Sequence, residues 1–132
     1  MTAVARRVPP RHCDAQGMMH ASRPAEYFED AFLAWLDGAC GYAALRAAGV
    51  DLVVAETTTR YLAPARLGDE LTAQATPEER SRRSVRIRFA LVGGDGEPLV
   101  TAATTYVCVG RDGSVPLPPV LDGALAGVPA RR

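Results

Sequence analysis

One stretch, SRPAEYFEDAFLAWLDGACGYAALR at residues 22–46, dominates the local pattern of the chain. Its apolar side chains recur at i, i+4, i+7, i+8 and i+11, which is the spacing of one face of an α-helix. The residues of this stripe are Phe28, Phe32, Trp35, Leu36 and Ala39. Pro24 suits a first helical turn because its missing N–H has no partner there, and Gly49 is a typical stop signal. The pattern predicts a helix of about 22 residues, or about 33 Å.

After this helix the apolar residues recur with a period of about 2 instead of 3.6, which indicates strands. The segments with this pattern are residues 50–62, 70–76, 82–92 and 99–109. The third segment alternates most cleanly, and its apolar face consists of Val85, Ile87, Phe89 and Leu91. Such alternation is typical of a half-buried antiparallel strand. We expect the four strands to follow one another as a meander.

A short strand is predicted at residues 3–8, and it ends at Pro9 because proline cannot donate a hydrogen bond to a neighbouring strand. Strands segregated from one long helix indicate an α+β fold, in which the helix covers one face of a five-stranded antiparallel sheet. We expect residues 1–132 to form a single domain, with loose tails at about residues 1–4 and 120–132. One helix covers only part of such a sheet, so a homodimer is expected to bury the rest.

Composition and charge exclude several classes of function. The chain has 132 residues, and its 15 basic side chains, all arginine, balance 15 acidic ones. A neutral chain offers no electrostatic attraction for nucleic acid or an anionic membrane. A run of about 18 apolar residues, as a membrane-spanning helix needs, is absent from the sequence. Three cysteines without a CxxC pair, and no export signal, predict reduced thiols in the cytoplasm.

The side chains that could perform chemistry lie in one segment, RHCDAQGMMH at residues 11–20, just before the helix. A carboxylate at Asp14 would lie near unpaired N–H groups of the helix N-terminus, and these groups can stabilise a developing oxyanion. This pairing suits acyl transfer, in which one group attacks or activates water while the other holds the oxyanion. The structural alternative is a plain turn, in which His12 and His20 are ordinary hydrogen-bonding histidines. The spacing of these residues fits no zinc site, so no metal is expected.

Other familiar catalytic motifs are absent: the sequence has no GxSxG, GxxxxGK[ST], GxGxxG or HExxH. It does resemble the hotdog-fold acyl-CoA thioesterases of the 4-hydroxybenzoyl-CoA thioesterase class. The segments that resemble this family are DAQGMMH at 14–20 with EYFE at 26–29, YLAPARLGDEL at 61–71 and RDGSVPLP at 111–118. The resemblance implies a hotdog fold, in which the sheet wraps around the long helix. It also implies homodimers, often paired into homotetramers, with an acyl-CoA in a groove between subunits.

The resemblance further implies a site for thioester hydrolysis. Asp14 would act as nucleophile or as general base, and Gly17 would keep the turn open. Backbone amides around Ala21 and Ser22 would polarise the thioester carbonyl. Coenzyme A is then part of the substrate, and no metal or other cofactor is required. The substrate would be an acyl thioester of coenzyme A or of an acyl carrier protein, and its phosphates would be contacted by two arginines, Arg82 and Arg83.

The sequence departs from the family pattern close to the predicted carboxylate. Pro10 stands where many relatives carry tyrosine, and Ala21 stands where many carry histidine or asparagine. His20, one residue earlier, can take over the role of that histidine. Because fold does not dictate function, a non-catalytic protein that binds acyl thioesters is the alternative. A hotdog dehydratase is a weaker third alternative, since no acid–histidine pair of that type can be placed.

Overall fold

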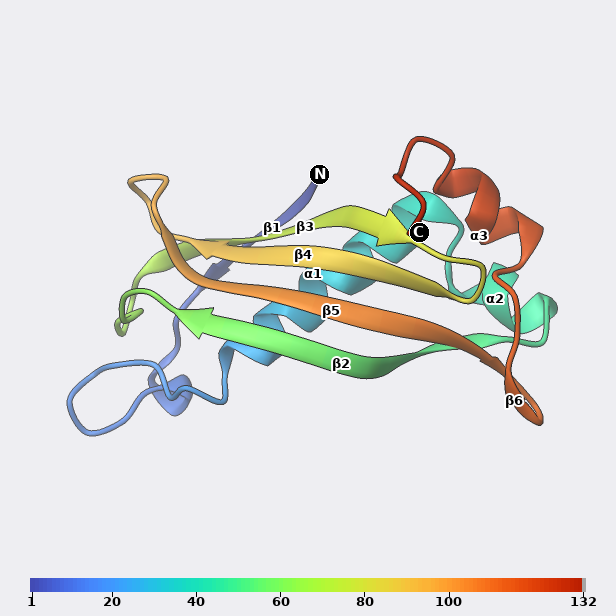
Figure 1. The fold of residues 1–132 in the computed structure, drawn as a ribbon. Helices are drawn as coiled ribbons and strands as arrows, with labels where there is room; N and C mark the ends of the chain where they lie inside the picture. The colour runs from blue at the N-terminus through green and yellow to red at the C-terminus, as the bar shows by residue number, and fades with distance from the viewer. Residues whose placement is uncertain (132) are drawn as a thin grey trace.

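The computed structural model describes residues 1–131, and Figure 1 shows their arrangement. Its strands are β1 (Thr2–Arg7), β2 (Asp51–Tyr61), β3 (Glu70–Arg80), β4 (Ser84–Val92), β5 (Pro98–Gly110) and β6 (Gly113–Ser114). Its helices are α1 (Pro24–Ala39), α2 (Tyr42–Ala47) and α3 (Pro119–Ala124), with a short 3-10 helix, η1, at Pro10–His12. None of the helices within residues 1–131 has both the length and the apolar composition that crossing a membrane requires.

The strands form one antiparallel sheet in the order β1-β3-β4-β5-β2, and β6 adds a two-residue pairing to β5. The predicted meander is therefore correct for β3, β4 and β5 and wrong for β2. β1 occupies the edge of β3 that β2 would need, with Arg7 opposite Glu70. β2 instead pairs with the far side of β5 and forms the other edge of the sheet. Alternation in a sequence gives the two faces of a strand but not its partners.

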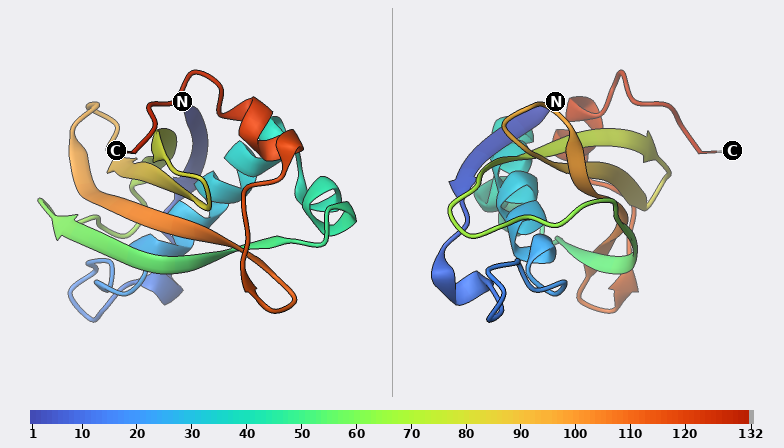
Figure 2. Two further views of the ribbon diagram at one scale, coloured as in Figure 1. Left: turned by 45° about the vertical axis from the view of Figure 1, so that its right-hand side comes forward. Right: turned by 90° about the vertical axis from the view of Figure 1, so that its left-hand side faces the viewer.

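The helix α1 packs on the concave face of the sheet, which curls around it (Figures 1 and 2). The predicted stripe faces the sheet: Phe28 stacks on Phe89 with ring centroids 5.2 Å apart, and Phe32 stacks on Tyr106 at 4.1 Å. The predicted apolar face of β4 is fully buried as well. The arrangement of one helix against five main strands confirms the α+β prediction.

The predicted helix is interrupted after its first 16 residues, at Ala39. The N–H groups of Cys40 and Gly41 both donate to the carbonyl oxygen of Leu36, at 2.9 and 2.8 Å, and this closes the helix. Gly41 has φ +81° and ψ 157°, a conformation that is almost restricted to glycine. The prediction that the helix continues to residue 46 is therefore wrong, because Gly41 ends α1 and α2 begins after it.

Replacing Gly41 by alanine is expected to lower the free energy of unfolding by about 1–3 kcal/mol, the usual cost of forcing a side chain into such a conformation. Gly38→Ala is the matched control. Gly38 lies inside α1, and a Cβ atom there would meet nothing within 4 Å. Alanine should therefore stabilise that position by about 0.5–1 kcal/mol. Urea denaturation of both variants measures the difference, and equal stabilities would contradict this account.

Loose tails are predicted at residues 1–4 and 120–132, and the described residues of both segments contact the rest of the fold. β1 pairs with β3 from Thr2 onward. In α3, Leu121 is fully buried, and so is Leu125 just after the helix. Leu117, Leu121 and Leu125 follow a helical spacing of four that the surrounding prolines and glycines obscure in the sequence. Arg132, the last residue of the predicted tail, lies outside the described residues.

Candidate active site

The segment between η1 and α1 folds back on the loop that joins β2 to β3. Met19 N–H donates to the carbonyl oxygen of Ala65, and Leu67 N–H donates to that of Gly17, both at 2.8 Å. Gly17 has φ +77°, which a side chain at this position would strain. These bonds fix the turn that the sequence predicts and bring it against residues about 50 positions later in the chain.

Asp14 lies exposed at the start of this turn. Its carboxylate oxygen Oδ1 accepts hydrogen bonds from the backbone N–H groups of Gln16, at 2.8 Å, and Met18, at 3.1 Å. The other oxygen, Oδ2, accepts no hydrogen bond from residues 1–131. One oxygen therefore holds the turn, while the second is free to contact a substrate or a water molecule.

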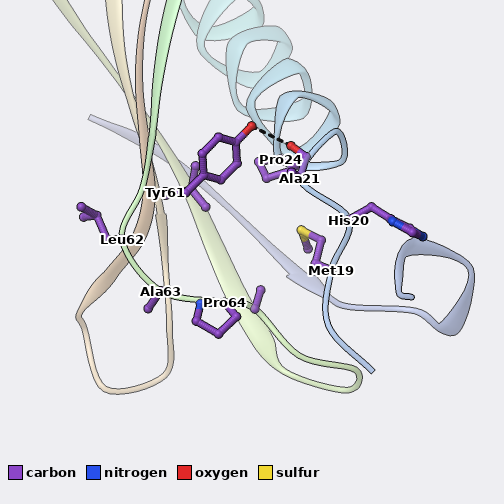
Figure 3. A pocket seen from close by; sticks show the side chains of 10 residues that line it. Met19, His20, Ala21, Pro24, Tyr61, Leu62, Ala63 and Pro64 are labelled. Carbon is purple, nitrogen blue, oxygen red and sulfur yellow. Dashed lines mark hydrogen bonds between the residues drawn. The ribbon is translucent and has the colours of Figure 1, made fainter. Parts of the chain in front are cut away.

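A pocket of about 370 Å³ opens between the start of α1 and the end of β2 (Figure 3). Its lining is mostly apolar and consists of Met19, His20, Ala21, Pro24, Tyr61, Leu62, Ala63, Pro64, Ala65 and Val100. The volume lies at the lower end of the range for ligand pockets, about 300–1,000 Å³. Of the predicted site residues, His20 and Ala21 line it, whereas Asp14, Gly17 and Ser22 do not.

The backbone at the mouth of the pocket offers hydrogen-bond donors. The N–H groups of Ala21 and Ser22 have no acceptor within residues 1–131. The carbonyl oxygen of Ala21 accepts a hydrogen bond from the hydroxyl of Tyr61 at 2.7 Å. Free N–H groups ahead of a helix suit a developing negative charge on oxygen. The predicted oxyanion donors thus lie beside an apolar pocket, although the side chain of Ser22 does not line it.

His12 has the structural role that the sequence left open. Its side chain is only 13% exposed, and its Nδ1 atom lies 2.7 Å from the Tyr27 hydroxyl. Burial, together with the nearby Arg23 guanidinium, lowers the pKa of His12 from its ordinary value. Burial likewise raises the pKa of Tyr27. Histidine, cysteine and acidic side chains form no group of three that could bind a metal ion within residues 1–131.

Arg82 and Arg83 lie in the turn between β3 and β4, at the opposite end of the sheet from the pocket (Figure 1). Ser84, next to this turn, pairs with Val107 of β5, whereas Tyr61 at the pocket pairs with Val100. Seven strand residues separate these positions, which corresponds to about 23 Å. Arg83 also donates to the Ser114 carbonyl and hydroxyl oxygens, both at 3.0 Å. One chain therefore does not bring these arginines to the pocket.

The sequence did not indicate the part of the pocket that β2 and its following loop provide. Tyr61 and Leu62 end the predicted strand at residues 50–62, and residues 61–65 belong to a family-like segment, but neither observation predicts that they line a pocket. The available signal is Pro64, which ends a β-branched run and favours a loop after Tyr61. That signal gives a strand end but cannot indicate that Tyr61 faces α1.

Comparisons with known proteins agree with the fold. The family model of the thioesterase-like superfamily matches residues 8–125. A hypothetical protein from Thermus thermophilus is 26% identical with a TM-score of 0.88, and the match covers 97% of this chain and 99% of that one. The 1,4-dihydroxy-2-naphthoyl-CoA thioesterase from Synechocystis is 20% identical with a TM-score of 0.84, covering 95% of each chain. A search of curated proteins finds no match.

A third solved structure is a Staphylococcus aureus protein in complex with CoA, 17% identical with a TM-score of 0.88. That match covers 96% of this chain and 82% of the other. These neighbours confirm the predicted hotdog arrangement of sheet and helix. Because the family model spans most of its length, this chain belongs to the thioesterase-like superfamily.

Proposed function

We propose that this protein hydrolyses acyl thioesters of coenzyme A or of an acyl carrier protein. The observation that carries the proposal is the apolar pocket at the start of α1, which Ala21 lines, together with the amides of Ala21 and the following Ser22, which have no acceptor within residues 1–131. An apolar pocket beside oxyanion donors suits an acyl group with its carbonyl at the mouth. The Synechocystis neighbour is a CoA thioesterase and the Staphylococcus neighbour was solved with CoA, which supports coenzyme A as the thiol carrier.

The proposed reaction uses Asp14 as the working carboxylate. Its free Oδ2 either takes a proton from water, which then attacks the thioester carbon, or attacks that carbon itself. The amides of Ala21 and Ser22 hold the negative charge on the carbonyl oxygen. The carbon–sulfur bond then breaks, and the departing thiolate takes up a proton from His20, which lines the pocket and is re-protonated with the proton that Asp14 took from water. If Asp14 attacks the carbon directly, the acyl group stays on Oδ2 as an anhydride until a water molecule hydrolyses it and restores the carboxylate. The products are a carboxylic acid and a free thiol.

A homodimer through β2 is part of the proposal. β2 has 11 residues and is bonded only to β5, so its other edge is open. Val53 and Val54 are among the large apolar side chains that it exposes. Long open edges are unusual in monomers because they invite pairing. If two β2 strands pair about a two-fold axis, the β3–β4 turn of one copy comes to the pocket end of the other. Arg82 and Arg83 would then serve the site of the second copy.

Replacing both Arg82 and Arg83 by alanine is expected to raise KM for an acyl-CoA by about 10-fold or more with little change in kcat. Charge-assisted hydrogen bonds to phosphate are worth about 1.5–3 kcal/mol each, and they act on substrate and transition state alike. Arg46→Ala, on α2, is the control. Steady-state kinetics measure the effect, and an unchanged KM would remove these arginines from the proposal.

Non-catalytic binding of acyl thioesters is the second candidate. It is favoured by one observation, that Asp14 does not line the pocket of the single chain. Calorimetry with acyl-CoA, alongside an assay of thiol release, distinguishes the two functions. Binding without release of thiol would favour the second candidate, and release that depends on Asp14 would favour hydrolysis.

A further inference from the structure

Tyr61 spans the space between β2 and the start of α1 (Figure 3). Its hydroxyl donates to the carbonyl oxygen of Ala21 at 2.7 Å, which joins residues 40 positions apart. Tyr61 as a whole residue is 58% exposed, so it is not packed in the core. The hydrogen bond to Ala21 is therefore the contact that fixes the ring across this space.

Two hollows lie between α1 and the sheet. One is lined by residues that follow Tyr61 in the sequence, and the other by β2 residues that precede it. The outer one is the pocket of about 370 Å³, which reaches from Tyr61 to residues 62–65. The inner one, of about 140 Å³, is lined on β2 by Val54, Thr57 and Thr59. The strand register places them in sequence, because Tyr61 is opposite Val100, Thr59 is opposite Ala102 and Thr57 is opposite Thr104.

The same order holds on the helix, where Pro24 lines the outer hollow and Ala25 and Phe28 line the inner one. The inner hollow therefore follows the outer pocket along α1 and β2. Tyr61 lines the outer pocket only, and along β2 it is the next residue on the same face after Thr59 of the inner hollow. At its inner end the Thr57 and Thr104 hydroxyl oxygens are 2.8 Å apart and satisfy each other. These two hydroxyls are therefore satisfied, and the charged side chain of the lining is the exposed Glu29 of α1.

We propose that Tyr61 determines which acyl groups this site accepts, by closing the way from the outer pocket to the inner hollow. This inference rests on the proposed function of the pocket. With the ring held by Ala21, compact acyl groups fill the outer pocket. Longer chains must displace the ring, and this breaks its hydrogen bond before they reach the inner hollow. The ring is a specificity determinant rather than a catalytic residue, since it carries no step of the reaction.

The test compares kcat/KM for butanoyl-CoA and dodecanoyl-CoA in Tyr61→Ala, Tyr61→Phe and the wild type. Tyr61→Ala is expected to raise the dodecanoyl-to-butanoyl ratio by about tenfold or more, because single methylene groups in apolar pockets already change such ratios by about 10–200-fold. Tyr61→Phe keeps the ring but loses the hydrogen bond, so a smaller rise is expected. Tyr42→Phe is the matched control, because Tyr42 is exposed on α2, away from the pocket lining.

Equal losses on both substrates in Tyr61→Ala, or an unchanged ratio in a folded variant, would overturn the proposal in favour of a merely structural role. The proposed hydrolysis can fail separately. If the wild type releases no thiol, the same ratio is measured as calorimetric affinity for the two acyl-CoAs. A shift toward dodecanoyl-CoA in Tyr61→Ala then still supports the specificity role. An unchanged affinity ratio, or no binding of either acyl-CoA, would overturn it.

Discussion

Asp14→Asn is expected to lower kcat for acyl-CoA hydrolysis by a factor of about 100 or more, which is the usual loss when a general base or nucleophile is removed. Asparagine retains a side-chain oxygen that can accept the hydrogen bonds of Gln16 and Met18, so the turn should persist. Asp14→Ala removes that acceptor as well. If the charge of Asp14 is what matters, both variants should lose activity to a similar extent, as thiol release in a coupled assay would measure.

Asp95→Asn provides the matched control for this experiment. Asp95 lies in the β4–β5 turn, where its Oδ1 atom accepts a hydrogen bond from the Glu97 N–H at 3.0 Å, so it has the same local role without being part of the proposed site. Its substitution should leave kcat unchanged. Full activity in Asp14→Asn with loss only in Asp14→Ala would mean that the residue holds the turn and performs no chemistry. That result would leave hydrolysis without its proposed carboxylate.

The sequence predicts most of the fold because faces are encoded locally. The spacing of Phe28, Phe32 and Leu36 gives the buried side of α1, and the alternation in β4 gives its buried face. The local pattern does not predict which strands pair with each other when they are far apart in the sequence. The position of β2 depends on which strand edge is already occupied by β1, and no periodicity records that. The end of α1 depends on the backbone conformation of Gly41, whereas glycine in a helical pattern is compatible with either outcome.

In the candidate site, too, features formed by local contacts could be predicted and features formed by long-range contacts could not. The turn at Asp14 and Gly17 could be predicted because aspartate and glycine form turns by local bonds. The position of Tyr61 at the pocket could not, because its hydrogen bond reaches Ala21 across 40 residues. The arginines Arg82 and Arg83 could be named from a resemblance, but their distance from the pocket depends on the sheet register. It is this distance that makes a second copy necessary for the proposed site.

Val54→Glu on the open edge of β2 is expected to convert the proposed dimer into a monomer and to lower kcat/KM by about 100-fold. Val54 is 58% exposed in the single chain, and burying a carboxylate there without a partner would be costly. Val120→Glu is the matched control, since Val120 is 44% exposed on α3, away from the β2 edge. Analytical ultracentrifugation gives the mass, and circular dichroism establishes that both variants fold. A dimeric, active Val54→Glu protein would exclude pairing through β2.

Mixing two defective variants tests whether each site draws on both copies. Consider a heterodimer of Asp14→Asn with the Arg82→Ala, Arg83→Ala double variant. One of its two sites lacks both the carboxylate and the two arginines, and the other site has all three side chains. Random pairing about a two-fold axis gives heterodimers in half of the molecules, so roughly one quarter of all sites are complete. Activity at low substrate concentration should then rise well above the mean of the two parents. If the arginines served their own chain, no mixture could contain a complete site, and the activity would stay at that mean.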